Sequence, residues 1–116
     1  MFRKLEKCKT TKYRAKIAKS GLTLNVPLAN RMMEMGFRYV EVLYKKEKDK
    51  FLLVLKKAKP DEPDAWKIGY KKTSGKNVYG YMWIKRLYRI IGEKDITTSR
   101  IELTDDAVTL EFPLEE

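Results

Sequence analysis

The same order of predicted secondary-structure elements occurs twice in this chain, and this repeat limits the possible folds more than any other feature. A segment with strand periodicity leads to a turn at Ser20-Gly21, a second strand that stops at Pro27, a short amphipathic helix closed by Gly36, and a hairpin. The order starts again after residue 64, with a turn at Ser74-Gly75 and a helix closed by Gly92. We interpret this as an internal duplication; the alternative is a single mixed sheet with two unrelated short helices.

The first half carries the clearer signals for individual elements. Basic and apolar residues alternate over residues 12–17, which is the period of a half-buried strand, and a second alternating segment covers residues 22–26. Proline suits the first turn of a helix, where its missing N–H would have no partner. Leu28, Met32 and Met35 then fall on one helical face. We therefore predict a helix over residues 28–35.

A hairpin is predicted after this helix. Residues 39–44 and 51–55 are strand-like, and every residue between the two segments is charged. The second segment, Phe-Leu-Leu-Val-Leu, has no polar face. We expect both faces of that strand to be covered.

Residues 59–64 are predicted to link two units, because they hold two prolines, three acidic residues and no apolar residue. Beyond them we predict strands at 66–73 and 77–81, a helix at 82–91, and a hairpin of 96–103 with 108–112. The predicted organisation is a basic N-terminal arm at 1–10, a first unit at 11–58, the linker at 59–64, and a second, divergent unit at 65–116. A unit of about 50 residues buries too little surface by itself. Residues 11–116 should therefore form one globular domain, in which Leu24 and Met32 share a core with Val78 and Leu87.

The charge of the chain restricts its partners. There are 26 Lys and Arg against 16 Asp and Glu, a net charge of +10, and residues 1–60 hold 17 of the basic residues but only 5 of the acidic ones. Such an excess favours a polyanionic partner over a neutral one.

The scarcity of histidine and cysteine excludes several kinds of chemistry. The chain has no histidine and a single cysteine, Cys8, so it lacks the residues for His/Cys zinc sites, Ser-His or Cys-His catalysis, haem ligation and disulfide scaffolds. We expect no enzymatic activity, no metal, no cofactor, and a reducing, cytoplasmic setting. The longest apolar run covers only residues 51–55, so we expect no membrane association.

The first unit resembles the N-terminal DNA-binding domain of the AbrB, SpoVT and MazE-type regulators. The residues that carry the resemblance are the turn glycine Gly21, the strand end Val26-Pro27 and the helix end Met35-Gly36-Phe37, and the resemblance covers residues 12–57. Those regulators dimerise by exchanging hairpins, and a chain with two units, as in the MraZ family, resembles that dimer made covalently. The resemblance implies an α+β fold of two β-α-β-hairpin units interlocked as a swapped-hairpin barrel.

The resemblance also implies a transcriptional regulator that binds double-stranded DNA through a Lys/Arg-rich face. Basic residues of the first strand, the turn and the start of the helix would face the duplex, and the repeat adds a second set. The predicted DNA-binding residues are Lys12, Arg14, Lys16, Lys19, Arg31, Lys71, Lys72, Lys76, Lys85 and Arg86. Lysine and arginine neutralise phosphates and release counterions, which supports the same assignment on physical grounds. Because lysine dominates the set, we expect mainly phosphate contacts and little base reading.

Other interpretations remain open from the sequence. An antitoxin or a phage or virus interaction protein would use the basic face to dock an acidic protein, and a homodimer is compatible with the sequence. An RNA or single-strand binder would use Tyr79, Tyr81, Trp83 and Tyr88 to stack on unpaired bases. Aromatic residues of this kind are more often part of a core, and that is our expectation for these four.

Overall fold

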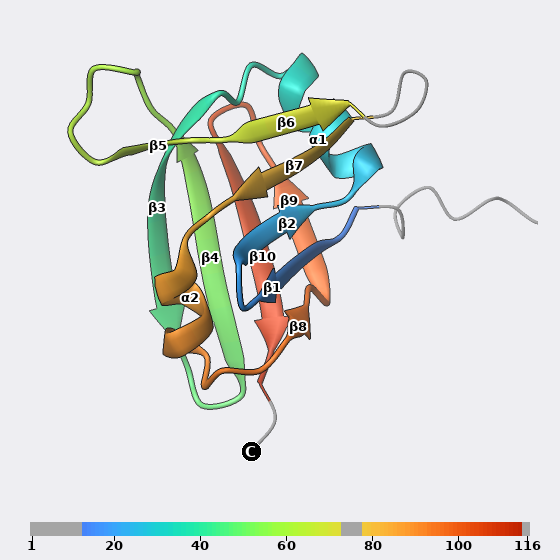
Figure 1. Cartoon of the computed structure of the whole chain (residues 1–116), viewed down its shortest axis with the longest axis vertical. Helices are drawn as coiled ribbons and strands as arrows, with labels where there is room; N and C mark the ends of the chain where they lie inside the picture. The colour runs from blue at the N-terminus through green and yellow to red at the C-terminus, as the bar shows by residue number, and fades with distance from the viewer. Residues whose placement is uncertain (1–12, 73–77, 115–116) are drawn as a thin grey trace, which may run out of the picture.

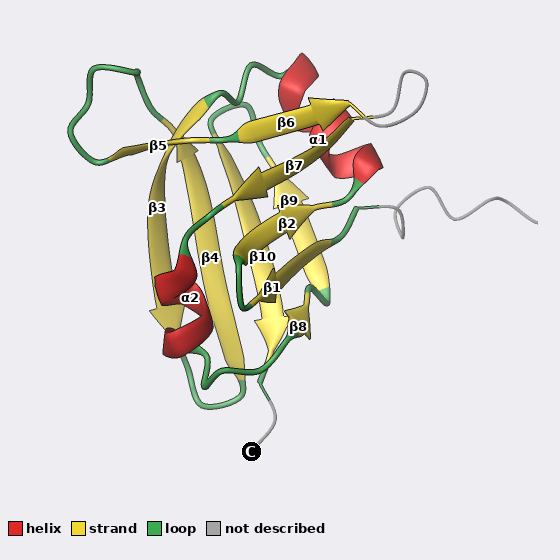
Figure 2. Cartoon of the chain, viewed as in Figure 1, coloured by secondary structure: helices red, strands yellow, loops and turns green. Residues whose placement is uncertain are grey.

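The computed structural model describes residues 13–72 and 78–114. Within those residues the protein is α+β, with two short helices and two five-stranded antiparallel sheets (Figures 1 and 2). The predicted basic arm at 1–10, Lys12, Lys76 and the predicted turn at Ser74-Gly75 lie outside the described residues.

The first sheet, sheet A, has the strand order β6-β7-β2-β1-β8, and all its neighbouring strands are antiparallel. Its central pair joins a strand of the first half, β2, to a strand of the second half, β7. The bounds of its strands are β1 (Ala15–Ala18), β2 (Gly21–Leu24), β6 (Gly69–Lys72), β7 (Val78–Met82) and β8 (Ile96–Thr97).

The second sheet, sheet B, has the strand order β5-β3-β4-β10-β9 and is also antiparallel throughout. Its central pair again joins the two halves, because β4 pairs with β10. In Figure 1 the strands of sheet A cross in front of the longer strands of sheet B. The bounds of its strands are β3 (Tyr39–Lys46), β4 (Lys50–Lys57), β5 (Ala65–Lys67), β9 (Arg100–Leu103) and β10 (Ala107–Pro113).

The two sheets are not closed into the barrel that the sequence led us to expect. The chain passes between the sheets through the helical segment that joins β2 to β3, at Ile68 between β5 and β6, and at Thr98-Ser99 between β8 and β9. The last passage is abrupt: the Thr98 N–H donates to the carbonyl of Ala15 in sheet A, whereas the Ser99 N–H donates to the carbonyl of Glu111 in sheet B. Backbone hydrogen bonding therefore changes partner sheet between two adjacent residues, which separates the two ladders.

Helix α1 (Val26–Glu34) confirms the predicted first helix, although it begins two residues earlier. The Asn25 side chain accepts a hydrogen bond of 3.2 Å from the Leu28 N–H and caps the helix, and Pro27 occupies the first turn. The helix buries Leu28, Ala29 and Met32, and Gly36 follows its end with φ +86°. It packs against β7, a strand of the other half.

Helix α2 (Lys85–Ile90) is shorter than the predicted helix over residues 82–91. Met82 belongs instead to β7, where it pairs with Leu22 and is buried, so the strand ends later and the helix starts later than predicted. The helix contacts β1 and β2 of the first half. Figure 1 shows α1 and α2 at opposite ends of sheet A. No helix in the described ranges is long and apolar enough to span a membrane.

The core lies between the two sheets and draws on both halves. Leu24, Met32 and Leu87 belong to one buried cluster, and the side chain of Val78 is outside the described set. The expectation that the strand over residues 51–55 is covered on both faces was wrong. In β4 buried residues alternate with half-buried ones, because only one face of sheet B packs on the core. The outward residues Leu52 and Val54 stay half-exposed.

Candidate nucleic-acid interface

The face of sheet A that points away from the core is termed the outer face of sheet A. One row of paired residues crosses all five strands, and alternate residues beneath it, such as Ile17, Leu22 and Leu24, are buried. Because side chains alternate between the faces of a strand, the members of the row share the outer face. The row consists of Gly69, Tyr81, Thr23, Lys16 and Thr97.

Three of the predicted DNA-binding residues lie on this face. Lys16 is exposed in β1, Lys71 is exposed in β6 opposite Tyr79, and Arg14 is exposed just before β1. The backbone of Arg14 is held in the sheet by Asn25, since the Asn25 N–H donates to the Arg14 carbonyl at 3.0 Å. Three inter-strand steps separate β6 from β1, or about 14 Å at the usual strand spacing. Cations therefore stand on both sides of the central strand pair.

The other predicted residues do not join this group. Lys19 and Lys85 line a hollow of about 410 Å³ with Asp95, at the end of the sheet where α2 lies. Arg31 lies on α1, at the opposite end, and forms an ion pair of 3.4 Å with Glu34. Lys72 is exposed, but it follows Lys71 in β6 and so points to the other side of that strand.

Arg86 is exposed in the first turn of α2, next to Lys85. The described members of the predicted set are thus divided among the outer face of sheet A, the other side of β6 and the two ends of the sheet. Among these residues, Arg14, Lys16 and Lys71 share one face of one sheet. We therefore take the outer face of sheet A as the candidate nucleic-acid interface.

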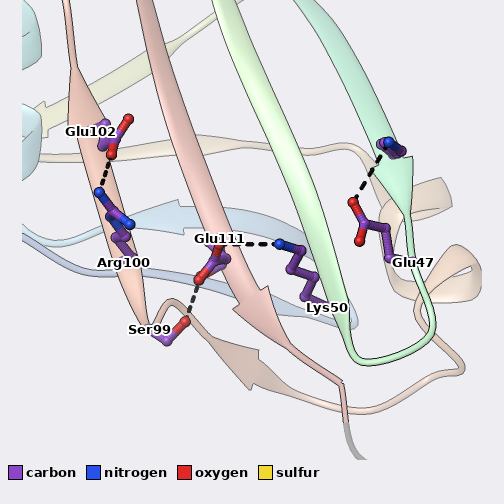
Figure 3. Close-up of polar contacts among 7 residues, drawn as sticks. Glu47, Lys50, Ser99, Arg100, Glu102 and Glu111 are labelled. Atoms are coloured by element: carbon purple, nitrogen blue, oxygen red, sulfur yellow. Dashed lines mark hydrogen bonds and ion pairs between the residues drawn. The ribbon is translucent and has the colours of Figure 1, made fainter.

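Charges on the two sheets are organised differently. On sheet A the ion pair formed by a strand residue is Lys16 to Asp95, at 3.5 Å and with both side chains about half exposed. On sheet B cations pair with acids of the same sheet: Lys50 contacts Glu111 at 4.0 Å across β4 and β10, and Arg100 contacts Glu102 within β9 (Figure 3). Ion pairing therefore offsets part of the positive charge of sheet B, whereas on the outer face of sheet A the pair with Asp95 offsets the charge of Lys16.

The aromatic residues correct one expectation. Tyr79 and Tyr81 are half-buried, Trp83 is 58% exposed, and none of the three belongs to the core or packs against it; Tyr88 is half-buried on α2. The reason is their spacing, because residues at every second position of β7 share a face, and the core face is taken by Gly80 and Met82. The pattern Tyr-x-Tyr-x-Trp was a usable signal for this face. The sequence groups these residues as candidates for base stacking, but the predicted helix over residues 82–91 separates Trp83 from the strand.

A groove adjoins these aromatic residues. It has a volume of about 500 Å³, and its lining includes two cations that the sequence analysis did not select, Arg38 and Lys67. Tyr70 also lines it, and burial raises the pKa of its phenol well above the ordinary value of about 10, although the nearby charge of Arg38 acts in the opposite direction. None of the described residues that line this groove is acidic.

Within the described ranges, no cluster of three or more Cys, Asp or Glu side chains has an arrangement that would hold a metal ion. Comparisons with protein families, curated proteins and solved structures found no match to this chain.

Proposed function

We propose that the protein binds double-stranded DNA as a transcriptional regulator, and that the outer face of sheet A is its DNA-binding surface. The observation that carries the proposal is the placement of Arg14, Lys16 and Lys71 on one face of one sheet, in a chain of net charge +10. Phosphates attract such cations, and the release of condensed counterions supplies sequence-independent affinity. Exposed lysine and arginine on one face of a sheet fit a phosphate backbone better than a neutral ligand.

We also infer that the two halves interlock in the swapped-hairpin manner of the AbrB-like regulators, without a closed barrel. Two observations support this. Each central strand pair, β2 with β7 and β4 with β10, joins one half to the other. Each helix also packs against strands of the opposite half, α1 on β7 and α2 on β2. A covalent pair of units would bring the basic strands β1 and β6 to the same sheet, as the proposed DNA surface requires.

The test is the salt dependence of duplex binding. A fluorescently labelled duplex is titrated with the full chain at several salt concentrations, and log K is plotted against log salt. Neutralisation of three or four phosphates predicts a linear plot with a slope of about −3. Absence of binding at about 50 mM salt would overturn the proposal, and an acidic protein would then be the better candidate partner.

A further inference from the structure

Three aromatic side chains form a row along the outer face of sheet A. Tyr79 and Tyr81 lie in β7 and Trp83 directly follows the strand. Ring centroids are 6.2 Å apart for Tyr79 and Tyr81, and 4.6 Å apart for Tyr81 and Trp83, with 34° between the planes of the second pair. Both pairs are tilted, and both centroid distances lie within the range of aromatic contacts. The row therefore places three neighbouring aromatic rings on the outer face of sheet A.

The neighbouring strand leaves space for this row. Gly69 lies opposite Tyr81, and a Cβ atom built on Gly69 would be 2.4 Å from Cζ of the tyrosine ring. The ring thus lies across β6 because β6 has no side chain at that point. The buried core consists of residues on the inner face and does not include Tyr81 or Trp83. Trp83 is 58% exposed, so core packing does not explain the position of these two rings.

Cations lie near the aromatic row. The groove that includes Tyr81 and Trp83 also includes Arg38 and Lys67, and its described lining contains no acid. Lys71 stands opposite Tyr79 in the next strand, and Lys16 stands two strands from Tyr81 in the same row. A planar apolar surface can stack with a planar ring of a ligand, and a neighbouring cation can bind an anionic group attached to that ring. A nucleotide with an unpaired base has that combination of groups, whereas the bases of a duplex are already stacked on one another.

We propose that the outer face of sheet A and the adjoining groove bind single-stranded nucleic acid, with unpaired bases stacked on Tyr81 and Trp83 and with Lys67 and Arg38 of the groove contacting phosphates. This inference goes beyond duplex binding but rests on the same basic face being a nucleic-acid surface. DNA and RNA single strands share the required chemistry, so both are used as probes. The stacking is sequence-tolerant because every base has an aromatic face.

Trp83 is its own reporter in this experiment. The chain has two tryptophans, so Trp66→Phe leaves Trp83 as the single indole fluorophore. Addition of an oligothymidylate of about 12 nucleotides, a length within the usual site sizes, should quench Trp83 fluorescence. A duplex of equal length should quench it much less, because its bases are not free to stack. Oligouridylate in a parallel titration distinguishes RNA from DNA.

Variants separate stacking from charge. Trp83→Ala should weaken binding of a labelled single strand by about tenfold, which is within the range for loss of one stacked base, and Trp83→Phe should recover part of the affinity. Duplex affinity should change little in either variant. Lys67→Ala should weaken single-strand binding, whereas Lys45→Ala removes the same charge from β3, outside the groove, and should have a smaller effect. Thermal unfolding of each variant checks that the fold is kept.

The outcomes distinguish the two proposals. Duplex binding without Trp83 quenching by either single strand, or single-strand affinity unchanged by Trp83→Ala, would overturn the stacking inference and leave the proposed function in place. Single-strand binding that is lost in Trp83→Ala, without duplex binding, would support the inference and overturn the proposed function. Competition by polyglutamate as strong as competition by the oligonucleotide would also overturn the inference, because charge alone would explain the binding.

Discussion

The Tyr70 hydroxyl donates a hydrogen bond to the backbone carbonyl of Phe37. The bond joins β6, the edge strand of sheet A, to the segment that follows α1, and Phe37 is fully buried. A phenol in that position can donate only while it is protonated. The hydrogen bond and the burial that raises the pKa of Tyr70 therefore favour the same protonation state.

The contribution of Tyr70 to the free energy of unfolding should therefore depend on pH in the alkaline range. The folded pKa of Tyr70 is raised above its unfolded value of about 10, so the stabilisation is fully present below pH 10 and decreases as pH rises beyond it. At neutral pH, Tyr70→Phe should lower the free energy of unfolding by about 1 kcal/mol, because one hydrogen bond is lost. The difference between wild type and variant should narrow above pH 10 in urea melts. A difference that stays constant through that range would mean that Tyr70 titrates alike in both states.

Charge removal from the outer face of sheet A should weaken duplex binding without unfolding the protein. The double variant Arg14→Ala, Lys16→Ala removes two exposed cations, so the salt slope should decrease by about 2 and the affinity should fall at every sequence tested. Its thermal midpoint should change little, since exposed substitutions usually cost less than about 0.5 kcal/mol.

The matched control is Lys45→Ala, Lys46→Ala, which removes the same charge from β3 in sheet B. We expect a much smaller change in the slope, because those residues are on the other sheet. Equal effects from the two double variants in the fluorescence titration would show that the DNA-binding face has been misplaced.

Two glycines with positive φ should respond very differently to alanine. Gly21 has φ +134°, and its Cβ would lie 2.3 Å from the Met82 carbonyl oxygen, whereas Gly92 has φ +93° and nothing within 4 Å of that point. Gly92→Ala should cost about 1 kcal/mol, from backbone strain alone. Gly21→Ala adds a clash between the backbones of β2 and β7 and should lower the thermal midpoint much further. Similar losses in both variants would mean that β2 and β7 are not closely packed at this point.

Local periodicity predicted most of the elements but not their assembly. Alternation around Lys16 and the helix signal at Pro27 are properties of neighbouring residues, and the structure has a strand and a helix at those places. The end of β7 depends instead on pairing between Met82 and Leu22, which are distant in sequence. The predicted start of the second helix at residue 82 is therefore wrong, and the helix begins at Lys85. The change of sheet at Thr98-Ser99 follows hydrogen bonds to the carbonyls of Ala15 and Glu111, which are distant in sequence, so no local pattern indicates it.

Part of the candidate interface also follows from local periodicity, and part of it depends on long-range strand pairing. The alternation in the first strand correctly places Arg14 and Lys16 on a polar face, because the period of a strand is visible in the sequence. The neighbourhood of Lys71 and the aromatic row follows from the pairing of β2 with β7, which no local pattern specifies. Gly69 beneath Tyr81 is likewise meaningful only once β6 and β7 are paired.

Separate expression of the two halves tests the interlocking directly. Residues 1–60 and 61–116 each contain one strand of both central pairs, so each piece alone would expose a core face and unpaired strand edges. Neither piece has the surface to bury a stable core at about 50 to 60 residues. We expect each to be unfolded or self-associated, and an equimolar mixture to recover the far-UV circular dichroism of the intact chain.

A core variant makes this last test specific. Leu53 is fully buried in β4 and pairs with Leu110 in β10, so Leu53→Ala in the piece of residues 1–60 removes packing that only the complex provides. In the intact chain a buried Leu→Ala costs about 2 to 5 kcal/mol, and the affinity between the pieces should fall by a comparable free energy. Recovery that is insensitive to Leu53→Ala, or a stably folded monomer of residues 1–60, would show that the first half builds its own core and that the halves are not interlocked.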